Sequence, residues 1–125
     1  ATVHDIWLEA AQMSGLVTTV NVEPGEYVRV ILVCAGGTGY EWQLTESKVS
    51  FLETVKSQVV AFPKSEQLMG GRVAYIFLYK APAEAAGDDR LTFGLYRSWE
   101  GVQKGVSMVE INVRYITGKE NKYEF

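Results

Sequence analysis

The chain contains one thiol and one imidazole, the pair of side chains that cysteine-based nucleophilic catalysis would need. Cys34 and His4 are the only cysteine and the only histidine among the 125 residues. An activated thiol also needs a third group that orients the histidine, and no Asn or Asp is set for that role. Cys34 instead continues an apolar run, where a free cysteine usually packs as a small hydrophobic residue. We therefore expect no thiol chemistry and no enzyme.

Metal and acid–base chemistry have no better support in the sequence. One cysteine with one histidine cannot form a disulfide or assemble a zinc site. The acidic residues lie at predicted turns and at outward positions of predicted strands, where charges are normally solvated; they include Glu41, Glu46, Asp88, Asp89 and Glu100. We expect neither a cofactor nor a catalytic carboxylate.

The first of three unusual loops is the segment Cys34–Tyr40, in which Gly36, Gly37 and Gly39 surround Thr38. The glycines remove side chains from the tip and leave backbone N–H and C=O groups open to a partner. A phosphate-binding loop would need a helix N-terminus and a lysine after the glycines, whereas a strand-like segment follows here. A contact loop is favoured, with a plain flexible turn as the alternative.

The second loop places two apolar residues, Leu68 and Met69, directly before the glycine pair Gly70 and Gly71. Exposed Leu and Met beside a bendable backbone make an adaptable contact surface. Packing of Leu68 in the core is the alternative interpretation.

The third loop combines the residue types that dominate binding hot spots in protein interfaces. Tyr96, Arg97 and Trp99 lie within four consecutive positions, with Ser98 between the arginine and the tryptophan. Tryptophan in a sandwich is more often a core residue, but Trp42 lies within a predicted strand and suits that role better. We therefore expect Trp99 to be exposed.

The elements that must hold these loops are β-strands. Short runs of β-branched and aromatic residues alternate with period two between turn residues, the pattern of an all-β protein. Val28, Val30 and Leu32, for example, share one face of a strand whose other face carries Arg29. Nine strands are predicted: Ile6–Ala10, Gly15–Val22, Tyr27–Cys34, Tyr40–Thr45, Val49–Leu52, Ser57–Phe62, Arg72–Lys80, Arg90–Tyr96 and Ser107–Ile116.

The remaining segments are predicted to be loops and a tail. Ala81–Ala86 has a helical composition, but it contains Pro82 and precedes the predicted turn Gly87–Asp89, so a loop is favoured. We expect one domain over residues 1–125, a two-sheet sandwich, with residues 118–125 as a frayed, solvated tail.

Composition and charge exclude some classes of binding partner. With 47% hydrophobic and 22% charged residues the chain is an ordinary globular sequence. A net charge of −3 with mixed signs offers no basic surface for nucleic acid or anionic lipid, and the apolar run Val28–Ala35 is too short to span a bilayer. We expect a monomer with no nucleic acid and no membrane. The start of the sequence lacks a signal peptide, which indicates an intracellular protein, or a secreted or periplasmic one if such a peptide has been removed.

The three loops resemble, in order, those of the chagasin family of cysteine peptidase inhibitors. That family's first loop reads Asn-Pro-Thr-Thr-Gly, then an aromatic residue and, two positions later, Trp; Thr38–Tyr40 and Trp42 match, whereas Ala35–Gly37 differ. The second loop carries a Gly-Gly pair after apolar residues, as Leu68–Gly71 do. The third reads Arg-Pro-Trp or Arg-Pro-Phe, which Arg97–Trp99 resemble with Ser in place of Pro. The missing prolines imply more flexible loops and either lower affinity or a different target.

The resemblance covers roughly Val17 to Val113 and implies an immunoglobulin-like two-sheet β-sandwich that inhibits papain-like cysteine peptidases reversibly and competitively. The loops would form a wedge with the Gly36–Tyr40 tip against the catalytic residues of the peptidase. Arg97, Ser98 and Trp99 would contact one wall of the cleft, and Leu68 to Gly71 the other. The alternative is an immunoglobulin-like adhesion or carbohydrate-binding module that uses Trp99, Tyr96 and Tyr40 as a stacking platform.

Overall fold

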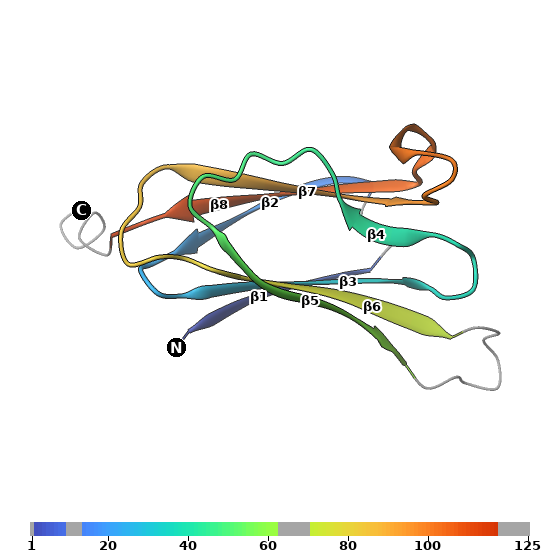
Figure 1. Ribbon diagram of the computed structural model, residues 1–125, viewed down its shortest axis with the longest axis horizontal. Helices are drawn as coiled ribbons and strands as arrows, with labels where there is room; N and C mark the ends of the chain where they lie inside the picture. The colour runs from blue at the N-terminus through green and yellow to red at the C-terminus, as the bar shows by residue number, and fades with distance from the viewer. Residues whose placement is uncertain (1, 10–13, 63–70, 118–125) are drawn as a thin grey trace.

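The computed structural model describes residues 2–9, 14–62 and 71–117. Within these residues it contains eight strands and one short 3-10 helix, and the strands form two four-stranded sheets that face each other (Figure 1). The all-β, two-sheet sandwich predicted from the sequence is confirmed. The predicted tail, residues 118–125, lies outside the described residues.

Each sheet has one parallel edge strand, and its other pairs are antiparallel. The first sheet has the order β1 (Val3–Glu9), β3 (Tyr27–Ala35), β6 (Arg72–Lys80), β5 (Glu53–Ala61). The second sheet has the order β2 (Ser14–Val22), β8 (Ser107–Tyr115), β7 (Asp88–Tyr96), β4 (Glu41–Leu44).

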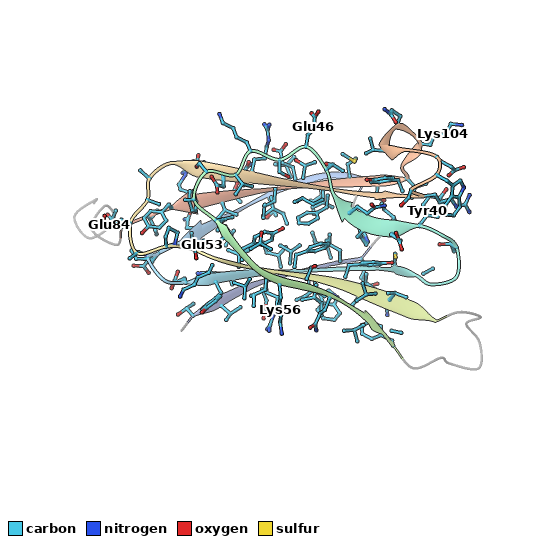
Figure 2. All side chains as sticks on the ribbon, in the orientation of Figure 1. Tyr40, Glu46, Glu53, Lys56, Glu84 and Lys104 are labelled. Carbon is cyan, nitrogen blue, oxygen red and sulfur yellow. The ribbon has the colours of Figure 1, made fainter. Side chains whose placement is uncertain are left out.

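The core lies between the sheets and is built by the alternation that the sequence shows. Side chains of β3 that point inward are fully buried, whereas Arg29 points outward and pairs with Asp5 of β1. The inward residues of the other central strands are buried in the same way, and they fill the space between the two layers in Figure 2; they include Leu91, Phe93, Leu95, Val109, Ile111 and Val113. Phe51, Leu52 and Ala81, which lie in connecting segments, are buried in the same core.

One predicted strand, Val49–Leu52, is absent, and one predicted solvated carboxylate, Asp89, is buried. Asp89 is 1% exposed, and its two carboxylate oxygens accept hydrogen bonds from the backbone N–H groups of Ser50, Phe51 and Leu52 and from the Ser50 hydroxyl, at 2.7–3.0 Å. In a strand, consecutive N–H groups point to alternate sides, whereas these three converge on one carboxylate, so the segment does not continue as a strand. Burial alone would raise the pKa of Asp89, but the hydrogen bonds outweigh it and hold the pKa below its usual value.

Other predicted boundaries shift by a few residues. β5 begins at Glu53, four residues before the predicted start, because Glu53 pairs with Lys80 of β6. β7 begins at Asp88 and so absorbs two residues of the predicted turn Gly87–Asp89. The 3-10 helix η2 (Val102–Lys104) was not predicted, whereas the prediction that 81–86 form a loop is confirmed.

Candidate interaction surface at one end of the sandwich

The strand ends bring the first and third loops to the same end of the molecule. β4 begins at Glu41, which pairs with Tyr96 at the end of β7, so the segments before Glu41 and after Tyr96 leave the second sheet together. Ala35 at the end of β3 pairs with Arg72 at the start of β6. The β3–β4 and β7–η2 connections therefore lie side by side at one end, as Figure 1 shows.

The first loop is a closed turn. The Thr38 hydroxyl donates to the Ala35 carbonyl oxygen at 3.4 Å and accepts from the Tyr40 backbone N–H at 3.2 Å. Gly37 and Gly39 have φ of 76° and 83°, values that only glycine adopts without strain. Thr38 itself is exposed at the tip. The side-chain hydrogen bonds of Thr38 close the turn without a proline; the greater flexibility expected from the missing proline stays a prediction.

The second loop is described only at its ends. The Gly36 backbone N–H donates to the Gly71 carbonyl oxygen at 3.0 Å, which joins the start of the first loop to the residue that precedes β6. Gly71 is buried. Leu68, Met69 and Gly70 lie outside the described residues, so their predicted contact role stays a prediction.

The third loop presents a tryptophan to solvent. Trp99 is 73% exposed, whereas Trp42 is buried in the core with its indole N–H donating to the Val33 carbonyl oxygen at 3.3 Å. The prediction that Trp42 is the core tryptophan and Trp99 the exposed one is confirmed. The turn that carries Trp99 is closed by the Arg97 carbonyl oxygen, which accepts from the backbone N–H groups of Glu100 and Gly101 at 3.0 and 3.1 Å.

Arg97 connects the first and third loops. Its Nε–H donates to the Thr38 carbonyl oxygen at 2.9 Å, and its guanidinium carbon lies 4.4 Å from the centre of the Tyr40 ring and 5.9 Å from that of Trp99. Both ring contacts are cation–π interactions. The structure therefore brings four of the predicted site residues, from segments about 60 positions apart, into one cluster.

Sequence reasoning missed Gln43. This residue of β4 donates from its amide to the hydroxyl of Ser98 at 3.2 Å and so adds a second side-chain link to the third loop. Its role depends on the pairing of β4 with β7. No local signal in the sequence reports that pairing, so Gln43 could not have been found from its neighbours alone.

The thiol and the imidazole are far apart. His4 is paired with Val28 across β1 and β3, and Cys34 lies six positions further along β3, a separation of about 20 Å. Cys34 is buried, and burial together with the negative charge of Glu41 raises the pKa of its thiol to about 11. The thiol is therefore protonated near neutral pH, and the interpretation of Cys34 as a packing residue is confirmed by its position in the core.

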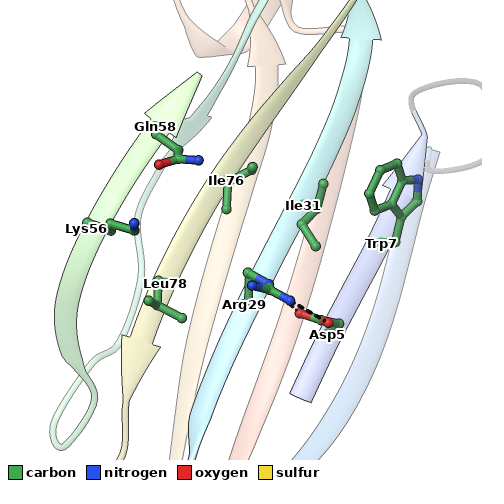
Figure 3. A pocket seen from close by; sticks show the side chains of 8 residues that line it. All are labelled: Asp5, Trp7, Arg29, Ile31, Lys56, Gln58, Ile76 and Leu78. Atoms are coloured by element: carbon green, nitrogen blue, oxygen red, sulfur yellow. Dashed lines mark hydrogen bonds and ion pairs between the residues drawn. The ribbon is translucent and has the colours of Figure 1, made fainter. Parts of the chain in front are cut away.

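The loop end is exposed and projecting, unlike the concave sites that bind small molecules. A hollow of about 380 Å³ lies instead on the outer face of the first sheet, lined by Trp7, Ile31 and Leu78 among others (Figure 3). Three charged residues line it, Asp5, Arg29 and Lys56; Asp5 and Arg29 satisfy each other through two hydrogen bonds. Within the described residues no group of three or more potential ligands could hold a metal ion, and no helix is long and apolar enough to cross a membrane.

Solved structures with the same fold include a cysteine protease inhibitor and a protein solved in complex with falcipain-2. The cysteine protease inhibitor EhICP2 from Entamoeba histolytica has a TM-score of 0.72 and 16% identity, with 92% of this chain and 96% of that chain covered. Amebosin has a TM-score of 0.63 and 19% identity, with 90% of this chain and 98% of that chain covered. PbICP-C, solved in complex with falcipain-2, has a TM-score of 0.60 and 17% identity, with 93% of this chain and 100% of that chain covered. At these identities the likeness establishes the fold, which confirms the predicted immunoglobulin-like sandwich.

Sequence comparison establishes the family. No curated protein matches the chain significantly. The model of the chagasin family of peptidase inhibitors, in contrast, matches residues 21–113, a span that contains all three loops. This chain is a member of the chagasin family of peptidase inhibitors.

Proposed function

We propose that this protein is a reversible, competitive inhibitor of papain-like cysteine peptidases that inserts the loop end of its sandwich into the catalytic cleft. The observation that carries the proposal is a cluster at one end of a member of an inhibitor family, in which the half-buried Arg97 braces the exposed residues Thr38, Gly39 and Trp99. PbICP-C, which has the same fold, is solved in complex with falcipain-2, and this supports a peptidase of that class as the partner.

The tip of the first loop suits the bottom of a narrow cleft. Gly36, Gly37 and Gly39 carry no side chains, so backbone groups reach the catalytic residues of the peptidase, with Thr38 as the one substantial side chain. The internal hydrogen bonds of Thr38 hold that backbone in a closed turn. A loop held in this way avoids hydrolysis when it presents no carbonyl in attack geometry to the peptidase thiol.

The third loop supplies contact area. The exposed indole of Trp99 would pack on one wall of the cleft, where a large ring with few rotatable bonds gains the most from burial. Leu68, Met69 and Gly70 are proposed to lie along the opposite wall, next to the Gly71 end that is hydrogen bonded to Gly36.

The carbohydrate-binding alternative loses support at Tyr40. A stacking platform needs open ring faces, but the Arg97 guanidinium already lies 4.4 Å from the centre of the Tyr40 ring. Trp99 and Tyr96 alone would form a small platform. We therefore assign the protein no lectin role, and we propose no catalytic activity of its own because the family to which it belongs consists of peptidase inhibitors.

Papain with a fluorogenic peptide substrate tests the proposal, and trypsin and thermolysin serve as controls of other mechanistic classes. We expect inhibition of papain alone, with an apparent inhibition constant that rises linearly with substrate concentration, as competition requires. Full papain activity at a large molar excess of the protein would exclude the proposed function.

A further inference from the structure

Arg97 makes several contacts within its own chain. Its side chain is 33% exposed, its Nε–H is used by the Thr38 carbonyl oxygen, and its guanidinium lies against the ring of Tyr40. Glu100 adds a carboxylate oxygen 3.7 Å from one terminal nitrogen. Contacts within the chain thus engage Nε–H and bring the guanidinium close to the Tyr40 ring, although the residue type is typical of direct hot-spot contacts.

Trp99 rests on Gly39, so the exposed indole is also placed by the first loop. A Cβ atom at Gly39 would lie 2.4 Å from Cη2 of Trp99, a distance that no side chain tolerates. Gly39 also has a φ of 83°. The absence of a side chain there lets the indole lie against the backbone of the first loop.

We propose that Arg97 is a positioning residue that joins the first and third loops into one preformed unit, so that the Thr38 tip and Trp99 enter the cleft together. This inference rests on the proposed function and goes beyond it by assigning Arg97 an effect that is exerted through Thr38, Tyr40 and Trp99. Direct attraction between its charge and the peptidase is the competing role.

The physical reason is the entropy of ordering. A first loop with three glycines has many accessible backbone conformations, and fixing them during binding would cost affinity. The hydrogen bond to Thr38 and the stacking on Tyr40 tie that loop to the third one before any partner arrives. Lysine cannot replace this brace, because it has no planar fork that donates and stacks at once.

The first measurement uses the free protein. Because the Trp99 ring contacts Gly39, its ring current displaces the Gly39 α-proton resonances, and the Trp99→Ala variant gives their undisplaced positions. We expect Arg97→Ala and Arg97→Lys to remove most of this displacement in NMR spectra of otherwise folded protein. Arg114→Ala is the matched control, because it removes an arginine that pairs with Asp88 at the opposite end of β7.

The second measurement is inhibition of papain by the same variants. We expect Arg97→Ala and Arg97→Lys each to weaken inhibition about 10- to 100-fold. This is the cost expected when the two or three groups that Arg97 positions must be ordered during binding instead of before it. In a Trp99→Ala background the further loss should be about 3-fold or less, since the main group that Arg97 positions is gone. Arg114→Ala should inhibit like the unsubstituted protein.

The outcomes separate the inference from the function on which it rests. Gly39 resonances unmoved by Arg97→Ala would overturn the positioning role, whatever the inhibition data. Inhibition retained by Arg97→Lys, or an equal loss with and without Trp99, would assign Arg97 to direct charge contact instead. A lack of papain inhibition by the unsubstituted protein would refute the proposed function, and the NMR result for the free loops would still decide whether Arg97 joins them.

Discussion

Trp99 is the residue whose removal should weaken complex formation most. Its side chain is 73% exposed in the free protein, so nearly three-quarters of its surface is available for burial in a cleft. A fully buried aromatic side chain covers about 150–250 Å², which gives roughly 110–180 Å² for Trp99. At about 25 cal/mol per Å² this corresponds to about 3–4.5 kcal/mol, reduced by about 1 kcal/mol for side-chain ordering.

We therefore expect Trp99→Ala to weaken binding by about 2–4 kcal/mol, a rise of roughly 30- to 1000-fold in the inhibition constant that comes mostly from faster dissociation. Progress curves with papain after dilution of the complex measure the dissociation rate directly. The free energy of unfolding of the same variant, measured by thermal unfolding, should change by about 0.5 kcal/mol or less, because an exposed side chain contributes little to folding.

Trp7→Ala is the matched control for Trp99→Ala. Trp7 is 55% exposed, but it lies on β1 at the outer face of the first sheet. Its replacement should leave papain inhibition unchanged. The reasoning fails if Trp99→Ala inhibits as well as the unsubstituted protein, or if its free energy of unfolding falls by about 3–5 kcal/mol, the loss expected for a core aromatic residue.

Two further substitutions test the core and the buried carboxylate. Cys34→Ser should retain inhibition, since Cys34 packs in the core and its thiol pKa is about 11; loss of inhibition in a folded variant would demand a thiol-based mechanism. Asp89→Ala should lose about 2–4 kcal/mol of unfolding free energy, because three backbone N–H groups lose their acceptor, whereas Asp88→Ala, at an exposed position, should lose little. Because the folded-state pKa of Asp89 lies below its unfolded value near 3.9, its stabilisation is present above about pH 4 and is lost as the pH falls through the folded-state value. Between pH 2 and 7, the melting temperature of Asp89→Asn should therefore fall less steeply with acidification than that of the unsubstituted protein. The same steepness in both proteins would contradict the assignment.

The core could be predicted because alternation is a local property of the sequence. Each strand that faces the other sheet places every second residue inward, and the inward residues are apolar from Val28 to Leu32 and from Val109 to Val113. The exposure of Trp99 was predictable for a related reason, since it follows a complete strand and precedes Gly101.

The interactions between distant segments could not be predicted. Val49–Leu52 has the composition of a strand, but its backbone donors are taken by a carboxylate that lies 37–39 positions away in the chain. The contact of Arg97 with Thr38 joins positions 59 apart. Both depend on which strands become neighbours, and a single sequence reports such pairing only through family resemblance.

The central claim is that the loop end covers the catalytic cleft of a papain-like peptidase. The most direct measurement is the rate at which iodoacetate alkylates the active-site thiol of papain in the presence of saturating protein; the buried, protonated Cys34 should not compete for the reagent. The wedge predicts that alkylation slows in proportion to the fraction of papain in complex, and that the released protein is intact. Alkylation at an unchanged rate in the fully formed complex would contradict it.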